Sequence, residues 1–211
     1  MELQDLRINY GKGAIPDGKS PGNPMMWFGD WLAEALSASL HEANAMVLST
    51  VSEKGSPSSR VVLLKAFEER GFLFFSNYES LKGYQITLNP AGSLLFFWPE
   101  LERQVRIEGK ITKADADVSD DYFYSRPLES RVSAAVSPQS RIVSSRTQLE
   151  QIHQDFLDTY PEGTFKRPDN WGGYWLSPDL FEFWQGRRNR LHDRIQYQLV
   201  ERKWEWNRLA P

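Results

Sequence analysis

The strongest constraint on the fold is a run of short strand-like segments between residues 45 and 112, the last of which alternates apolar and polar side chains. Between residues 103 and 112, Val105 and Ile107 alternate with charged and amide side chains. A period of two places successive side chains on opposite faces of a β-strand. Turns or one short helix separate these segments, and short connections join antiparallel strands. Together with a later hairpin, the pattern predicts an α+β, mainly β fold: an antiparallel closed or split β-barrel with flanking helices.

The same periodicities, with helix capping signals, give the expected elements. Strands are expected at residues 45–52, 58–67, 72–77, 93–98, 103–112, 171–176, 180–184 and 203–207. Helices are expected at 24–40, after the N-cap Asn23, and at 80–89, 115–124 and 144–160. Residues 125–140 are expected to form a polar loop. Residues 1–22 are polar and rich in Gly and Pro, so we expect a flexible arm followed by a single domain over residues 23–211.

Composition excludes several classes of function. The chain of 211 residues has a formal net charge of −3, whereas general binding of nucleic-acid phosphates needs a basic surface. It has no cysteine, which excludes disulfides and thiolate catalysis, and its histidines, His41, His153 and His192, are scattered, so no metal site is expected. Neither a basic leader followed by an apolar run nor a run of about eighteen apolar residues occurs, so we expect a cytoplasmic protein without a membrane partner.

One basic stretch, residues 184–194 (WQGRRNRLHDR), concentrates the side chains that carry chemistry. It holds four arginines, His192 and Trp184, opposed by Asp193 alone. One interpretation is a solvated basic turn. The other is the mouth of a hairpin that holds a flat anionic ligand, because an alternating apolar run leads into the arginines and alternation resumes after them. Guanidinium groups pair with phosphate, an indole covers an aromatic ring, and imidazole exchanges a proton near neutral pH.

Six motifs in one order carry a family resemblance. They are residues 60–65 (RVVLLK), 102–105 (ERQV), 125–127 (SRP), 137–140 (SPQS), 171–173 (WGG) and 184–194. From about residue 6 to the C-terminus, the chain resembles the pyridoxamine 5'-phosphate oxidase family of FMN-binding split-barrel enzymes. The resemblance implies oxidation of pyridoxamine or pyridoxine 5'-phosphate to pyridoxal 5'-phosphate by hydride transfer from C4' to N5 of the flavin. Oxygen is the implied acceptor, with release of hydrogen peroxide and, from the amine, ammonia.

The resemblance also assigns the cofactor site. The residues expected to bind FMN are Arg60, Val61, Val62, Leu63, Leu64, Lys65, Phe75, Ser76, Lys82, Gln104, Gln139, Ser140, Trp184 and Arg194. Arg60 and Lys65 lie five residues apart, so a regular strand would direct them to opposite faces, one toward the flavin and one toward the substrate. Lys82 begins a short helix, where the helix dipole also favours an anion. In the family the last four residues of this set reach the cofactor from the second subunit, which implies a homodimer with FMN at its interface.

The substrate site is implied in the same way. The residues expected to bind substrate are Arg7, Tyr10, Lys65, Tyr122, Arg126, Ser130, Arg190 and His192. Four of them, at positions 65, 122, 126 and 130, match the family's clamp for the substrate phosphate. Arg190 and His192 match the residues that hold the pyridine ring against the flavin, and they are the expected catalytic residues. Arg7 and Tyr10 belong to the arm, which in the family can fold over the substrate.

Three positions depart from the family's pattern. Leu81 stands where an arginine commonly precedes the lysine, Phe75 where a tyrosine is frequent, and Ala135 where some members have a bulkier residue. The missing cation at position 81 predicts weaker binding of the FMN phosphate. Two alternatives are that position 81 faces solvent, or that Arg141 takes the place of the missing arginine.

Two other functions are compatible with the same fold, because a fold does not fix a function. One is a related flavin oxidase that acts on another ring system, such as the phenazine-pathway relatives. The other is a non-catalytic carrier of flavin or pyridoxal phosphate. The presence of the whole implied substrate set favours the oxidase of B6 phosphates over both.

Overall fold

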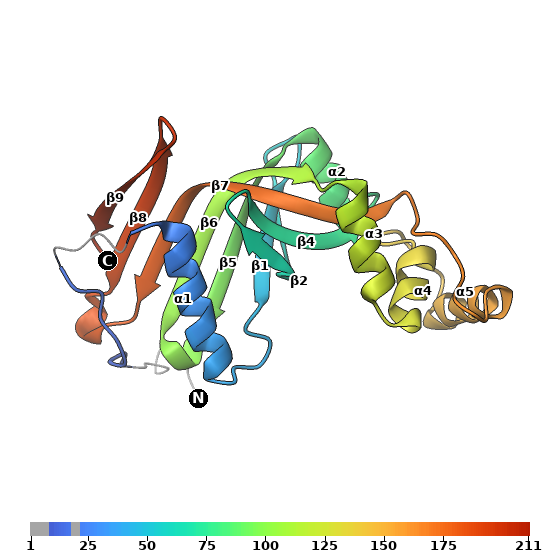
Figure 1. The fold of residues 1–211 in the computed structure, drawn as a ribbon, viewed down its shortest axis with the longest axis horizontal. Helices are drawn as coiled ribbons and strands as arrows, with labels where there is room; N and C mark the ends of the chain where they lie inside the picture. Colours follow the sequence, from blue (N-terminus) through green and yellow to red (C-terminus); the bar gives the residue numbers. More distant parts are fainter. Residues whose placement is uncertain (1–8, 18–21) are drawn as a thin grey trace.

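The computed structural model describes residues 9–17 and 22–211, and within them nine strands form one antiparallel sheet with five α-helices around it (Figure 1). The strands are β1 (Ala45–Val51), β2 (Pro57–Leu63), β3 (Ala66–Glu68), β4 (Gly71–Asn77), β5 (Ala91–Trp98), β6 (Arg103–Lys113), β7 (Trp171–Gln185), β8 (Asp193–Val200) and β9 (Lys203–Leu209). The α-helices are α1 (Pro24–Ser37), α2 (Leu81–Leu88), α3 (Ala116–Ser125), α4 (Leu128–Val136) and α5 (Arg146–Thr159).

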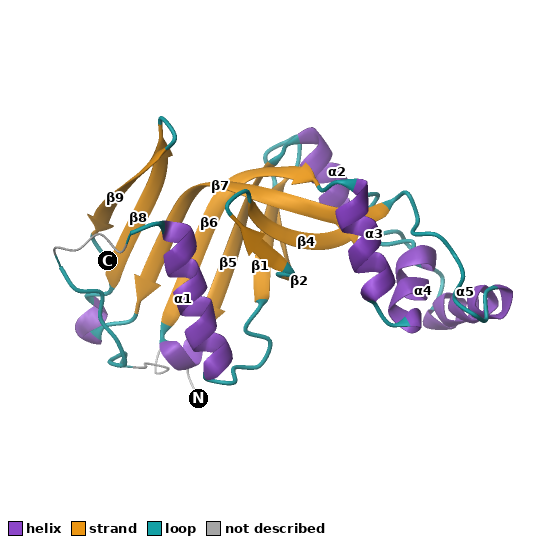
Figure 2. Ribbon diagram, in the orientation of Figure 1, coloured by secondary structure: helices purple, strands orange, loops and turns teal. Residues whose placement is uncertain are grey.

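The sheet divides at its longest strand, β7. The main strand order is β2-β1-β5-β6-β7-β4-β3, and β8 and β9 continue from β7 outside this path. The first half of β7 pairs with β4 and its second half pairs with β8, while β6 pairs along both halves. Figure 2 shows the resulting curled sheet with α1 across one face and α3–α5 at one end. The predicted antiparallel split barrel with flanking helices is therefore confirmed.

A bulge explains why the sequence predicted two strands where the structure has one β7. The register between β6 and β7 shifts between Glu108 and Gly109, which lie opposite Leu180 and Pro178 and leave Asp179 as the extra residue on β7. Proline cannot donate to a sheet ladder, and bulges are where strands accommodate it. A Cβ atom at position 109 would lie 2.0 Å from the carbonyl oxygen of Ser177, so only glycine allows this approach. The ladder continues past the interruption instead of ending there.

The main core lies between α1 and the sheet. Helix α1 begins at the predicted N-cap, since Asn23 Oδ1 accepts a hydrogen bond from the backbone N–H of Met25 at 2.8 Å. Its buried face carries Phe28 and Trp31, and Trp27 stacks on Phe183 of β7 with ring centroids 3.9 Å apart. Burial of each such aromatic side chain stabilises the fold by roughly 1.5–3 kcal/mol. Aromatic packing thus fixes α1 against β7.

A second, smaller core joins α3, α4 and α5 to the start of β7. Its buried residues include Phe123, Val132, Phe165 and Trp171. The expected polar loop at 125–140 is wrong, because it contains helix α4. Only two α4 residues are fully buried, so its apolar face is too narrow to show as a helical period in the sequence.

The strand expected over residues 58–67 is also divided. Strand β2 ends at Leu63, and β3 begins at Ala66. Between them the chain changes partner, because the N–H of Leu64 bonds to Asn44 O while the N–H of Lys65 bonds to Leu73 O, both at 2.9 Å. This change of partner interrupts the regular alternation of side chains on the two faces.

The described part of the N-terminal arm, residues 9–17, lies against the sheet. The N–H groups of Gly11 and Lys12 donate to Glu102 Oε2 at 2.7 and 2.9 Å, and the N–H of Ile15 donates to Asp193 Oδ2 at 2.9 Å. Ile15 itself is buried in the main core. Arg7 lies outside the described residues, and the flexibility of the arm stays a prediction. Of the helices in the described ranges, none is both long enough and apolar enough to cross a membrane.

Candidate functional site

A cavity of about 370 Å³ opens between β2, β4, α2 and α3. Its lining residues are Arg60, Val61, Val62, Leu63, Lys65, Phe75, Ser76, Lys82, Tyr122, Arg126, Gln139 and Trp171. Four of these side chains are cationic and none is a carboxylate, so the lining has no internal counter-charge. A cavity of this composition favours an anionic ligand.

Arg60 reaches the cavity from β2, where it pairs opposite Leu48 of β1. Its Nη1 donates to Leu48 O at 3.1 Å and to Thr50 Oγ1 at 2.6 Å. Burial lowers the pKa of Arg60, but an arginine stays protonated at physiological pH. The charge of Arg60 is therefore held in place by two neutral acceptors.

Lys82 lies near it, on the first turn of α2. Ser80 caps this helix as predicted, with its Oγ accepting from the N–H of Gly83 at 3.3 Å. Lys82 Nζ donates to Ser76 Oγ at 3.0 Å and to Gln139 Oε1 at 2.8 Å. Burial, and then the charge of Arg60, lowers the pKa of Lys82 to about 8. An anion between the two cations would reverse this shift.

Three parallel rings form an aromatic wall of the cavity. Phe75 stacks on Tyr122 with centroids 4.0 Å apart and on Trp171 with centroids 5.5 Å apart. The guanidinium of Arg126 lies 4.8 Å from the centroid of Trp171, and Lys65 Nζ lies 5.6 Å from that of Tyr122. Arg126 Nη1 is buried without a hydrogen-bond partner among residues 9–17 and 22–211, and burial lowers the pKa of Arg126. Because Arg126 also lines the cavity, this donor is a candidate contact for a ligand there.

Arg60 and Lys65 do not face opposite sides, because both line this one cavity. The expectation assumed a regular strand, whereas β2 ends at Leu63 and the chain turns before residue 65. Leu64 does not line the cavity. It is buried in the main core, and its backbone N–H and C=O are both hydrogen-bonded to Asn44.

The loop after α4 places Gln139 in the cavity of its own chain. Gln139 was expected to reach the cofactor from the subunit opposite Lys82, but its Oε1 accepts from Lys82 Nζ of the same chain. The unpredicted helix α4 explains the difference, because it ends three residues before Gln139 and returns the chain toward α2. Ser140 is exposed with a φ of +69°, and Ser130 is half-buried on α4. Neither of these two residues lines the cavity.

A second group of predicted residues gathers at the other end of the sheet. Trp184 near the end of β7 pairs opposite Gln104 of β6 and opposite Arg194 of β8. Its ring lies 4.7 Å from that of His192 and 5.6 Å from that of Tyr10. In Figure 1 this end of β7 lies far from α2 and α3, so one chain keeps the two groups apart.

His192 has a defined protonation state in this group. Its Nδ1 accepts a hydrogen bond from the backbone N–H of Arg187 at 3.1 Å. Burial, and then the charge of Arg190, lowers the pKa of His192 below its usual value of 6.5. The ring is therefore neutral at pH 7, and its proton lies on Nε2, because Nδ1 is an acceptor.

Arg194 is held by a buried carboxylate. Its Nε donates to Glu182 Oε1 at 2.8 Å, and its Nη1 donates to Ala210 O at 2.9 Å. Arg106 Nη2 donates to Glu182 Oε2, also at 2.8 Å. Burial alone would raise the pKa of Glu182, but the hydrogen bonds from both arginines outweigh it and lower the pKa. Sequence reasoning missed Glu182, since its partners lie on two neighbouring strands.

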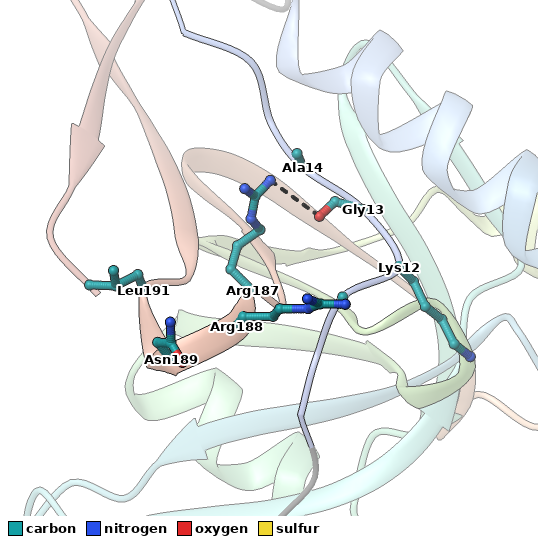
Figure 3. Close-up of a pocket in the computed structure, with 8 residues that line it drawn as sticks. Lys12, Gly13, Ala14, Arg187, Arg188, Asn189 and Leu191 are labelled. Atoms are coloured by element: carbon teal, nitrogen blue, oxygen red, sulfur yellow. Dashed lines mark hydrogen bonds between the residues drawn. The ribbon is translucent and has the colours of Figure 1, made fainter.

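The basic loop after β7 borders a cavity of about 520 Å³ against the N-terminal arm (Figure 3). Arg187, Arg188 and Lys12 contribute side chains, and Arg187 Nη1 donates to Gly13 O at 3.4 Å. Arg190, which has a φ of +60°, is exposed and does not line this cavity. The two expected catalytic residues thus lie beside the cavity and not within its wall.

The described residues contain no group of three or more His, Cys, Asp or Glu side chains arranged to hold a metal ion. Trp171 is a site residue that sequence reasoning did not assign. It lies in the motif at residues 171–173, so the motif itself was the available signal.

Two family models match this chain. Residues 32–156 match the family model described as pyridoxamine 5'-phosphate oxidase. Residues 171–211 match the model described as the pyridoxine 5'-phosphate oxidase C-terminal dimerisation region. A protein of Burkholderia vietnamiensis named pyridoxine/pyridoxamine 5'-phosphate oxidase is 49% identical over 212 residues, covering 99% of this chain and 99% of that protein.

Two solved structures are also similar. PhzG from Burkholderia lata, in complex with tetrahydrophenazine-1-carboxylic acid, has a TM-score of 0.88 at 27% identity and covers 95% of this chain and 100% of its own. A pyridoxamine 5'-phosphate oxidase-related, FMN-binding protein from Nostoc punctiforme has a TM-score of 0.69 at 20% identity, covering 92% of this chain and 98% of its own, a likeness of fold alone. The family models and the relative that spans the whole chain show that this protein belongs to the pyridoxine/pyridoxamine 5'-phosphate oxidase family of oxidoreductases.

Proposed function

We propose that the protein is an FMN-dependent oxidase that converts pyridoxamine 5'-phosphate and pyridoxine 5'-phosphate to pyridoxal 5'-phosphate. The observation that carries the proposal is the cavity at β2 and α2, with four cations, no carboxylate and a wall of stacked rings. Such a lining fits a ligand pair that brings two phosphates and two flat ring systems into one place.

The residues present fit FMN. Arg60 and Lys82 would hold its phosphate, since both are cationic, partly buried and hydrogen-bonded only to neutral groups within the described residues. Ser76 and Gln139 add polar atoms beside them, and Val61–Leu63 add an apolar edge. Bound FMN would supply the acceptor for a hydride from C4' of the substrate, with oxygen as the final acceptor and hydrogen peroxide as the product.

A separate clamp in the same cavity would take the substrate phosphate. Arg126 offers a buried Nη1 that has no partner, and Lys65 offers an ammonium over Tyr122. Ser130, on α4, belongs to this clamp by family resemblance, although it does not line the cavity. Two phosphates require two sets of cations, and the cavity supplies both.

The second group of residues, at the far end of β7, would complete the site from a partner subunit. The end of β7 and the start of β8, which carry this group, lie far from α2 in one chain (Figure 1). They belong to the region that matches the family's C-terminal dimerisation model. A two-fold axis would bring each such group to the cavity of the other chain and create two equivalent sites.

In that shared site, His192, Arg190 and Tyr10 would bind and orient the substrate. Neutral His192 would donate from Nε2 to an oxygen or phosphate of the substrate, because Nδ1 is already an acceptor. Arg190 would orient the substrate ring at the reacting carbon, and Tyr10 would cover it from the arm. Orientation at hydride-transfer distance contributes a large part of such a rate enhancement.

The experiment that tests the function is a flavin spectrum of the purified protein, followed by measurement of peroxide release. We expect a yellow protein that releases one peroxide for each pyridoxal 5'-phosphate formed. Absence of bound flavin after addition of FMN, or no peroxide with either B6 phosphate, would reject the proposal.

Mixing two variants, each impaired when assayed at low substrate concentration, tests the shared site. Arg126→Ala damages the cavity, and Arg190→Ala damages the group at the far end of β7. In a mixed dimer one site carries both changes and the other carries neither, so refolding the variants together should restore roughly a quarter of the wild-type activity. A site built within one chain would give no recovery.

A second candidate function follows from the structural likeness to PhzG, which was solved with tetrahydrophenazine-1-carboxylic acid. This ligand has a carboxylate in place of a phosphate, so the cation set for the substrate would meet an anion with fewer oxygens and less charge. Peroxide release with this acid, and none with the B6 phosphates, would support the second candidate over the first.

A further inference from the structure

A chain of buried polar side chains lies directly behind Arg60. Thr50 of β1 is fully buried, and Gln85 of α2 is 4% exposed. Arg60 Nη1 donates to Thr50 Oγ1 at 2.6 Å, and Thr50 Oγ1 donates to Gln85 Oε1 at 2.6 Å. Gln85 Nε2 in turn donates to Ser58 Oγ at 3.1 Å. The chain thus joins β1, β2 and α2 behind the wall of the cavity.

The hydrogen bonds in this chain form one consistent series of donors and acceptors. A guanidinium only donates, so Thr50 must accept from Arg60. The single hydroxyl hydrogen of Thr50 is then free to point to Gln85 Oε1, and the amide of Gln85 is oriented by its bond to Ser58. Buried polar networks in which each member has its partner are rigid, and they specify one arrangement of their side chains.

Arg60 is anchored through one nitrogen only. Among the described residues both of its hydrogen bonds leave from Nη1, to Leu48 O and Thr50 Oγ1. Its Nε and Nη2 make no hydrogen bond there, and Arg60 lines the cavity. The same network includes Gln85, which lies three residues after Lys82 on α2, so it links the position of Arg60 to that of the helix that carries the second cation.

We propose that Thr50 and Gln85 are positioning residues for the FMN phosphate, acting through Arg60. They hold the guanidinium so that its remaining donors face the ligand, at a fixed spacing from Lys82. This inference rests on the proposed function, because it takes FMN as the ligand of Arg60. Thr50 shares the buried face of β1 with Met46 and Leu48. Packing alone would favour an apolar side chain at this position, so the hydroxyl supports a positioning role.

The test compares FMN with riboflavin, which has the same ring and ribityl chain but no phosphate. Thr50→Val keeps the shape of the side chain and removes its hydroxyl, and Thr50→Ser is the matched control that retains it. We expect the Kd for FMN, from flavin fluorescence, to rise by roughly five- to twentyfold in Thr50→Val, as for the loss of one well-oriented charged contact. The Kd for riboflavin should stay within about twofold, and Thr50→Ser should bind FMN nearly as the wild type does.

A double-mutant cycle shows whether the effect passes through Arg60. In the Arg60→Ala background, Thr50→Val should weaken FMN binding no further, because the residue it positions is gone. Gln85→Met, which keeps the length of the side chain, should reproduce the selective loss of FMN and carries the same test if Thr50→Val fails to fold.

Two results would overturn the inference. One is an equal loss of FMN and riboflavin in the variants, which would make Thr50 and Gln85 ordinary parts of the core. The other is an undiminished effect of Thr50→Val without Arg60. The wild type separates this failure from that of the proposed function: a wild type that binds FMN no better than riboflavin rejects a phosphate site altogether, and with it both proposals.

Discussion

The two ends of the sheet treat arginine in opposite ways. In the cavity at β2 and α2, Arg60 and Arg126 have no carboxylate partner among the lining residues. At the far end of β7, Arg194 bonds to Glu182, and Arg187 and Arg208 both pair with Asp193. The pKa values follow the difference: burial lowers that of Arg126, whereas the bond to Glu182 raises that of Arg194.

The cations that line the cavity have no carboxylate among the other lining residues, whereas these arginines at the far end of β7 have one within the chain. A partly buried cation without a carboxylate partner can still pair with an anionic ligand, but burying its charge costs desolvation energy. A cation paired within the chain loses that capacity but fixes the strands that carry it. In this protein the unpaired set lies in the cavity, and the paired set aligns the strands that carry Trp184 and His192.

The largest effect is expected from breaking the paired set. Glu182→Ala leaves Arg106 and Arg194 without their shared carboxylate, whose side chain is 5% exposed. We expect the free energy of unfolding to fall by about 2–3 kcal/mol, less than for a fully buried pair because both arginines reach solvent. Denaturant titration measures it. Glu205→Ala, an exposed glutamate on β9, is the control and should change stability by no more than about 0.5 kcal/mol.

The second-largest effect is expected at the cavity, whose cations Arg60, Lys65, Lys82 and Arg126 form the unpaired set. Arg126→Ala removes a buried donor that has no partner within the described residues. Substrate binding should weaken by about 1.5–3 kcal/mol, the range for a hydrogen bond to a charged group, with flavin content nearly unchanged. The Michaelis constant for pyridoxamine 5'-phosphate and the flavin absorbance check both statements. Arg146→Ala on the exposed face of α5 is the matched control, and a loss of FMN equal to that of substrate would assign Arg126 to the other phosphate.

A smaller effect is expected from pH. Lys82 has a pKa of about 8 in place of its ordinary 10.5, so it loses its proton as pH rises through 8. A bound phosphate favours the protonated form, and FMN binding above pH 8 must therefore take up a proton. We expect the Kd for FMN to be constant near pH 7 and to rise by about five- to tenfold by pH 9. Lys82→Arg should flatten this dependence, because arginine stays protonated, and a wild-type Kd without a slope would contradict the assignment.

Sequence reasoning reached those features that depend on local pattern. Strand alternation gave the antiparallel barrel, and Asn23 and Ser80 marked the starts of α1 and α2. Helix α4 was not predicted because it buries so few residues. The sequence did not predict that Arg60 and Lys65 line the same cavity, because the chain changes strand partner between them. Such a change depends on tertiary strand pairing and leaves no local pattern.

The contacts that position the site residues could not be predicted from the sequence for the same reason. Thr50 and Gln85 are separated by 35 residues, and Arg194 and Glu182 lie on different strands. No period or motif relates the members of either pair. Such positioning contacts are visible only once the register of the sheet is known.

The smallest effect tests position 81, where the unpaired set lacks the cation common in the family. Leu81, the first residue of α2, is 53% exposed. Arg141, the possible substitute for the missing arginine, already pairs with Glu79, with Nη2 and Oε2 3.6 Å apart. An exposed charge pair is worth about 0–1 kcal/mol, and Leu81→Arg should tighten FMN by up to about fivefold at low salt. The gain should shrink as salt rises, because the new charge is screened. Fluorescence titration of the apoprotein at two salt concentrations measures it, with Leu81→Gln as the uncharged control. An unchanged Kd in Leu81→Arg, together with a large loss in Arg141→Ala, would instead show that Arg141 leaves Glu79 and already supplies the missing charge.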